Sequence, residues 1–208
     1  SLCILLSSYF IYNSMGAIDE QAIDDLHLVL HLAKHIHVKS AAHGGDAAKT
    51  WELAQHFPAF LWVIRDFHLR LADEHGNPIT ERDYLETALR PARGQEEKNK
   101  LRDMIRELFR DRDCMTLVRP VADESDLRHV QRLPYESLRP QFRSKVESFV
   151  DKVYADLAPK TIGGVDVSGE MFVQLASEYC TAINNSVVPN IQSAWTSVVQ
   201  QQLRLCLR

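Results

Sequence analysis

The fold is specified most clearly by the segment Phe57-Pro58-Ala59-Phe60-Leu61-Trp62-Val63-Ile64-Arg65-Asp66-Phe67. Its apolar run has no helical periodicity, is rich in aromatic and β-branched residues, and ends abruptly in an arginine–aspartate pair. Such a run is typical of a buried β-strand, which we expect over about 58–66. The strand would place Arg65 and Asp66 at its carboxyl end, where ligands bind in open α/β sheets.

Two other apolar runs predict strands in the same sheet. We expect one strand over 2–12, ended by Asn13-Ser14-Met15-Gly16, and a short one over 114–118, ended by Pro120. Apolar residues at helical spacing predict intervening helices over 19–38, 80–88 and 101–109. Strand, helix, strand in this order is typical of a parallel sheet with helices on its faces, so the fold class is α/β.

The loops and helix starts are marked by composition. Residues 39–49 and 90–100 are small or polar, and we expect loops there. Thr80 followed by Asp83 resembles a capping box.

Beyond residue 123 the pattern is helical almost throughout. Two helices with a bend at Pro134–Pro140 are expected first. Gly163-Gly164 then interrupts the chain, and two further helices are expected over about 169–186 and 189–206.

Composition restricts the class of protein. The chain has 208 residues, 45% apolar and 25% charged, with a net charge of −4 and a pI near 6.1, which is typical of a globular domain. Both signs of charge are interspersed, which argues against a nucleic-acid partner. Four scattered cysteines without a Cys-x-x-Cys motif favour the cytoplasm. No apolar run approaches the roughly 20 residues of a membrane helix.

The carboxylate of Asp66 has a specific chemical use. At a sheet edge it can accept two hydrogen bonds, from the N1–H and the 2-amino group of a guanine, while Arg65 stacks on a base or orients the carboxylate. Adenine presents an acceptor where guanine presents a donor, so a fixed carboxylate would reject it. The alternative is an ion pair at the strand end that binds no ligand.

Several short motifs, taken in order, resemble the guanylate-binding proteins, the interferon-inducible large GTPases of the dynamin superfamily that are related to atlastin. The similarity runs from about residue 5 to about residue 200. It rests on five matching segments: Leu5–Gly16, Trp62–Phe67, Asn77–Thr80 with Tyr84–Glu86, Cys114–Val121, and Lys160–Gly164 with Val167–Gly169.

The resemblance implies a fold and a function. Residues 1–158 would be the C-terminal portion of a GTPase domain with an incomplete P-loop-type sheet, and residues 159–208 the beginning of a helical middle domain. Arg65 and Asp66 would bind guanine. Arg119, Pro120 and Val121 would form the cap over the base and contact a second GTPase domain in a nucleotide-dependent homodimer. Val118 and Ala122-Asp123 depart from the family pattern beside this loop.

The machinery for the triphosphate does not occur in these residues. The sequence contains no Gly-x-x-x-x-Gly-Lys-Ser/Thr run. Asp-x-x-Gly occurs at Asp73–Gly76 and Asp166–Gly169, but neither is of the kind that senses the γ-phosphate, because in the family that the chain resembles that motif lies before the first strand of this chain. We therefore assign no catalytic residue in this chain. We expect the chain alone neither to hydrolyse GTP nor to bind it tightly; the intact parent would bind GTP with Mg²⁺ and hydrolyse it, and would reach membranes only through other regions.

Two alternatives differ in function from a GTPase of this family. A degenerate domain that docks a protein partner would need no phosphate loop, and an atlastin-type membrane-fusion GTPase would share the same core. A metal site is a separate possibility, because His27, His31 and His35 recur at i, i+4, i+8. No further ligands complete a known motif, so we expect a solvated histidine stripe and no metal.

Overall fold

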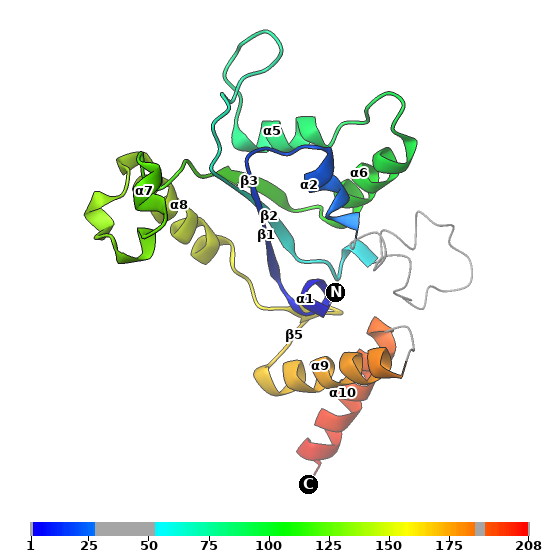
Figure 1. Cartoon of the computed structure of the whole chain (residues 1–208). Helices are drawn as coiled ribbons and strands as arrows, with labels where there is room; N and C mark the ends of the chain where they lie inside the picture. Colours follow the sequence, from blue (N-terminus) through cyan, green and yellow to red (C-terminus); the bar gives the residue numbers. More distant parts are fainter. Residues whose placement is uncertain (1, 28–52, 186–189, 208) are drawn as a thin grey trace.

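A computed structural model of the chain describes residues 2–27, 53–185 and 190–207. Three strands form a parallel sheet in the order β1-β2-β3, with β1 at Tyr9–Met15, β2 at Ala59–Arg65 and β3 at Arg112–Thr116 (Figure 1). The predicted α/β class and the parallel sheet are therefore confirmed.

The central strand β2 is buried on both faces, which explains its continuous apolar sequence. Phe60, Trp62 and Ile64 alternate into the larger core, whereas Leu61 and Val63 face a smaller cluster on the other side. Leu61, Trp62 and Ile64 are 0% exposed. This alternation fixes the register of the sheet, because a slip by one residue would exchange the two faces.

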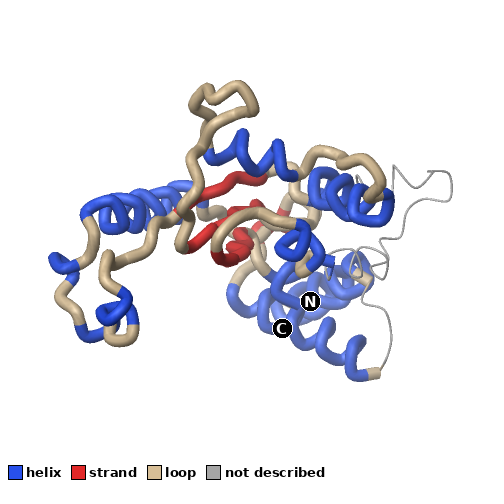
Figure 2. The backbone as a smooth tube through the Cα atoms, turned by 45° about the horizontal axis from the view of Figure 1, so that its top comes forward, coloured by secondary structure: helices blue, strands red, loops and turns tan. Residues whose placement is uncertain are grey.

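Helices cover both faces of this sheet (Figure 2). The helix α8 packs Phe142, Val146, Phe149 and Val153 against the smaller cluster. Among the described residues, the α-helices are α1 (Leu2–Leu6), α2 (Glu20–Asp24), α5 (Glu81–Ala88), α6 (Glu96–Leu108), α7 (Glu124–Leu127), α8 (Pro140–Asp156), α9 (Gly169–Asn184) and α10 (Ile191–Cys206). Residues of α1, α2, α5, α6, α9 and α10 contribute to the larger core, whereas α7 contributes none.

The start of the chain differs from the prediction. Residues 2–6 are helical, not part of a strand, and Ile4 and Leu5 pack into the core shared with α9 and α10. A short apolar run without clear periodicity fits a buried helix as well as a strand. At its other end, β1 continues to Met15, beyond the predicted stop.

The polar residues near the end of β1 stay in the strand because their side chains bond to β2. Ser14 Oγ accepts a hydrogen bond of 2.8 Å from Trp62 Nε1, and Asn13 Oδ1 accepts one of 2.8 Å from Arg65 Nε. These bonds join the two strands through side chains as well as backbone.

Two other segments are shorter or longer than predicted. The expected loop over 90–100 ends at α6, which begins at Glu96; Asn99 of this helix bonds the backbone N–H and carbonyl of Ala92. The first helix expected after residue 123 consists of α7 and the 3-10 turn Val130–Arg132, and a second 3-10 turn, Tyr135–Ser137, lies in the expected bend. These short elements project away from the sheet (Figures 1 and 2).

Two further local predictions are confirmed, and one is wrong. Thr80 and Asp83 form the capping box that begins α5. Gly163 and Gly164, both with positive φ, connect the two-residue strands β4 (Thr161–Ile162) and β5 (Val165–Asp166) of a hairpin. The single helix predicted over 19–38 is interrupted, because α2 ends at Asp24 and a turn follows at residues 25–26. Residues 28–52, which include the rest of that prediction and the loop expected over 39–49, lie outside the described part of the chain.

Lys160 joins the C-terminal part of the chain, which contains α9 and α10, to the amino edge of the sheet. Its Nζ donates to the carbonyl oxygens of Ser7, at 3.0 Å, and His56, at 2.8 Å, which precede β1 and β2. Burial lowers the pKa of Lys160 from 10.5 to about 8. Burial, with Lys160 nearby, also lowers the pKa of His56 below 6.5, so the histidine titrates in a different pH range.

This pKa predicts a pH-dependent stability. The folded state disfavours the charged lysine, so the contribution of Lys160 to stability increases as pH rises from about 8 towards the ordinary pKa of 10.5. The free energy of unfolding of the wild type, minus that of Lys160→Met, should rise by about 1–2 kcal/mol between about pH 7.5 and 9.5. Urea unfolding at each pH measures it; a difference that stays constant with pH would contradict the prediction.

Candidate functional site

The carboxyl edge of the sheet contains an irregular backbone at the arginine–aspartate pair. Leu117 N–H donates to Ile64 O at 2.8 Å, and Leu117 O accepts from Phe67 N–H at 2.9 Å. In a regular parallel ladder the second bond would come from Asp66, two residues after Ile64. One extra residue is therefore inserted between the two bonds, which defines a β-bulge.

Asp66 has the backbone conformation that such a bulge requires. Its φ is +54°, the only positive φ at a non-glycine residue among the described residues. Aspartate is one of the few L-residues that adopt this left-handed region readily. Bulges next to functional sites often redirect a side chain, and that is the effect here.

The redirection can be followed from the alternation along β2. Because Phe60, Trp62 and Ile64 face the larger core, a regular strand would also turn residue 66 into it. The bulge shifts the alternation by one residue, so Phe67 enters the core at 7% exposure and its ring contacts that of Tyr84, with centroids 5.5 Å apart. Asp66 is only partly buried and lines a cleft.

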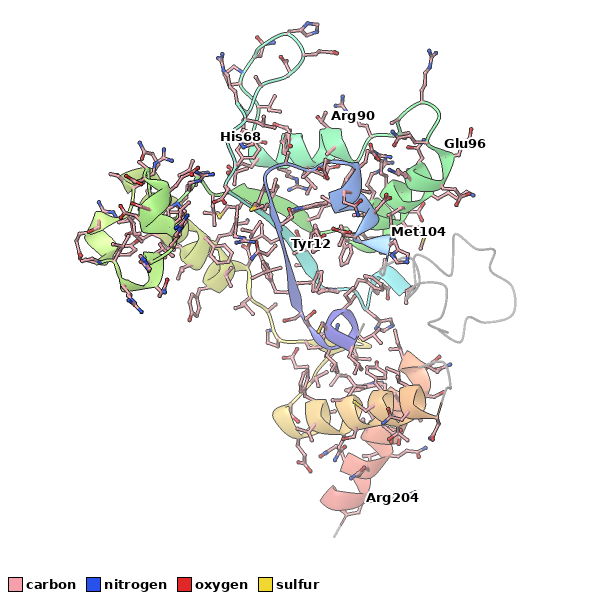
Figure 3. All side chains as sticks on the ribbon, viewed as in Figure 1. Tyr12, His68, Arg90, Glu96, Met104 and Arg204 are labelled. Carbon is pink, nitrogen blue, oxygen red and sulfur yellow. The ribbon has the colours of Figure 1, made fainter. Side chains whose placement is uncertain are left out.

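This cleft, which we call the carboxyl-edge cleft, has a volume of about 720 Å³. One wall is formed by residues 66–69, which we call the bulge wall. The other lining residues, which we call the cap wall, are Val118, Arg119, Val121, Ala122 and Arg139. Figure 3 labels His68 of the bulge wall where the chain leaves the sheet near α5.

A backbone hydrogen bond from Arg139 connects the two ends of the segment that contains most of the cap wall. The backbone N–H of Arg139, the residue before α8, donates to Pro120 O at 2.8 Å, so the excursion over 121–138 leaves and returns at one place. The guanidinium of Arg119 lies 3.5 Å from the Glu124 carboxylate and is 42% exposed. Two arginines and one aspartate thus supply the charged groups of the cleft.

The structure brings together most of the residues that the sequence selects. Asp66, Arg119 and Val121 line the same cleft, and Pro120 contributes the carbonyl bonded by Arg139. Arg65 is exposed at the end of β2 and bonded to Asn13 of β1. No sequence pattern pointed to Arg139, since this residue lies far along the chain from both other segments.

The described residues contain neither a metal-binding cluster nor a helix that could span a membrane. Of the three spaced histidines, His31 and His35 lie outside the described residues, and His27 lies within them. Within the described residues, no group of three or more His, Cys, Asp or Glu side chains could hold a metal ion. Among the same residues, no helix is both long and apolar enough to cross a bilayer.

The fold and the cleft define an α/β protein with a candidate ligand site at the carboxyl ends of parallel strands. The family model for the N-terminal domain of guanylate-binding proteins matches residues 1–162. The chain belongs to the guanylate-binding protein family.

Individual relatives agree with this assignment. The chain is 38% identical to human guanylate-binding protein 4, over 96% of this chain and 32% of the relative. It is 36% identical to mouse guanylate-binding protein 3, over 97% of this chain and 33% of the relative, and 36% identical to human guanylate-binding protein 2, over 96% and 34%. The chain thus spans about a third of the length of these relatives. The similarity favours neither the non-catalytic module nor the atlastin-type alternative.

The left-handed conformation of Asp66 predicts the relative stability of two variants at this position. Asp66→Gly removes the Cβ that crowds this conformation, whereas Asp66→Ala keeps it. We expect Asp66→Ala to be less stable than Asp66→Gly by about 1 kcal/mol, the reverse of the order found in regular strands and helices. Chemical denaturation of both variants measures the difference. An alanine variant at least as stable as the glycine variant would show that residue 66 does not adopt the left-handed backbone conformation.

Proposed function

We propose that the carboxyl-edge cleft binds the base of a guanine nucleotide and that Asp66 recognises it. The observation that supports this is the bulge, which turns the Asp66 carboxylate out of the core and into a cleft at the strand ends. A carboxylate is an acceptor only, and it matches the adjacent N1–H and 2-amino donors of guanine. Arg65, held by Asn13, would lie beside the base or the ribose.

The intact protein would be a GTP hydrolase. The chemistry is transfer of the γ-phosphoryl group to water, which depends on phosphate contacts and on Mg²⁺ that accompanies GTP. The printed sequence has no phosphate-loop motif, so this chain would provide base recognition and not phosphate binding. Without charge-assisted phosphate contacts, the chain alone would bind GTP weakly and would not hydrolyse it.

The cap wall would have a second role in assembly. Arg119, Pro120 and Val121 lie where a loop covering the base could also meet a second copy of the protein. The partial exposure of the Arg119 guanidinium leaves it available for such a contact. We propose a nucleotide-dependent homodimer through this surface.

The cysteines support a proposal about the cellular compartment. Cys3, Cys114 and Cys180 carry no disulfide, and burial raises the pKa of the Cys114 thiol well above its ordinary value, as for an unreactive core residue. Free cysteines support our proposal that the protein works in the cytoplasm.

The base-recognition role predicts a change in nucleotide preference. In the longest native protein that carries this chain, Asp66→Asn should weaken GTP binding and strengthen XTP binding. The amide can donate to the 2-oxo group of xanthine but cannot accept two hydrogen bonds as the carboxylate does. We expect the ratio of the two dissociation constants to change by about 10-fold or more.

Competition against a fluorescent GDP analogue gives both constants. Asp103→Asn is the matched control, because Asp103 pairs with Arg106 on the surface of α6. An unchanged ratio in Asp66→Asn would remove Asp66 from the base site.

The assembly role predicts the effect of reversing a charge. Arg119→Glu should lower dimerisation driven by a GTP analogue, measured by analytical ultracentrifugation at nucleotide concentrations that saturate each variant. Arg93→Glu, an exposed position between α5 and α6, controls for the change in net charge. Dimers of wild-type stability in Arg119→Glu would exclude the proposed contact.

A further inference from the structure

The carboxylate of Glu81 connects three elements around the carboxyl-edge cleft. Glu81 is the first residue of α5, and its side chain is 19% exposed. Its Oε1 accepts hydrogen bonds from the Thr116 backbone N–H at 2.8 Å and from the Thr116 hydroxyl, and it lies 2.8 Å from Lys145 Nζ. One oxygen therefore holds the end of β3 and a residue of α8 together.

The bonds to Thr116 connect Glu81 to the bulge wall. Thr116 is the last residue of β3 and is 7% exposed; its N–H points to the edge of the sheet away from β2, where Glu81 takes the place of a neighbouring strand. The next residue, Leu117, makes the two backbone bonds that flank Asp66. A displacement of Thr116 would therefore shift the bulge and the Asp66 carboxylate with it.

The bond from Lys145 connects Glu81 to the cap wall. Lys145 lies in the second turn of α8, and the helix begins directly after Arg139. Arg139 lines the cleft and bonds Pro120 O. The position of α8 relative to β3 thus determines where Arg139 of the cap wall and Pro120 lie. Glu81 joins these two elements, because it bonds both Lys145 of α8 and Thr116 of β3.

Both walls of the cleft therefore depend on a single carboxylate that does not line it. We infer that Glu81 is a positioning residue that fixes the Asp66 carboxylate relative to the cap wall and so determines how strictly guanine is distinguished from purines without its 2-amino group. The inference rests on the proposed function, because it assumes that Asp66 contacts the base. A hydrogen-bonded carboxylate is needed here, since the Thr116 N–H and hydroxyl would otherwise be left unpaired.

The chain provides a matched control on the same helix. Glu86, near the other end of α5, accepts a hydrogen bond of 2.8 Å from Arg112 Nη2, and Arg112 is the first residue of β3. This pair joins the same helix to the same strand, but at the end remote from the cleft. Its loss should lower stability without altering base discrimination.

The test compares GDP with IDP, whose base lacks the 2-amino group that Asp66 would contact. Dissociation constants are measured by competition in the longest native protein that carries this chain, for the wild type, Asp66→Asn, Glu81→Ala, Glu81→Gln, Thr116→Val and Glu86→Ala. We expect the ratio of the IDP constant to the GDP constant to fall about 3- to 10-fold in Glu81→Ala and less in Glu81→Gln, which keeps an oxygen acceptor for Thr116. Thr116→Val should lower it in the same direction, and Glu86→Ala should leave it unchanged.

The outcomes separate the inference from the proposed function. If the wild type prefers GDP and Asp66→Asn loses this preference, but Glu81→Ala and Thr116→Val keep it, Asp66 recognises the base and the positioning role of Glu81 is wrong. An equal loss in Glu86→Ala would also overturn that role, because it would show a general effect of destabilising α5. If Asp66→Asn keeps the preference, the proposed base contact fails, and the inference fails with it. If Glu81→Ala does not fold, Thr116→Val alone tests the positioning role of Glu81, because valine keeps the shape of threonine and removes only the hydroxyl that bonds Glu81.

Discussion

The site depends on one irregularity in an otherwise regular parallel ladder. Leu117 bonds to Ile64 on one side and to Phe67 on the other, and the extra residue between them moves Asp66 off the core face of β2. Without this insertion the aspartate would continue the row of Phe60, Trp62 and Ile64 into an apolar core, where an unpaired carboxylate is costly. The left-handed backbone of Asp66 is therefore tied to its exposure in the cleft.

The strain of this conformation is offset by burial on either side of it. Before the bulge, β2 is fixed by packing on both faces; after it, Phe67 returns to the core and contacts Tyr84. A left-handed non-glycine residue costs of order 1 kcal/mol, whereas burying a phenylalanine side chain contributes about 2–3 kcal/mol. The balance favours the bulge, and the apolar residue directly after the aspartate is what makes it stable.

The sequence predicted the elements well where a pattern was long and the residues chemically distinct. The buried run of β2, the Thr80–Asp83 cap and the Gly163-Gly164 turn each combine composition with fixed spacing, and each is confirmed. The run over 2–6 was assigned wrongly because it is too short to show a period. The bulge was not predicted, although Phe67 carried a signal: an apolar residue out of alternation with Phe60, Trp62 and Ile64. Arg139 lines the cleft and Glu81 connects its walls through contacts between distant segments, which spacing along one chain does not reveal.

The two ends of the sheet make different contacts: the amino edge holds another part of the chain, and the carboxyl edge borders the cleft. At the amino edge, Lys160 and α1 attach the helical segment; at the carboxyl edge, one aspartate and two arginines face a cleft. Contacts to a base distinguish between nucleotides because a mismatched partner leaves polar groups unpaired, whereas most of the affinity for a nucleotide comes from its charged phosphates. A cleft of this composition is therefore suited to selecting guanine, and tight binding of GTP would require the phosphate contacts to be supplied beside it.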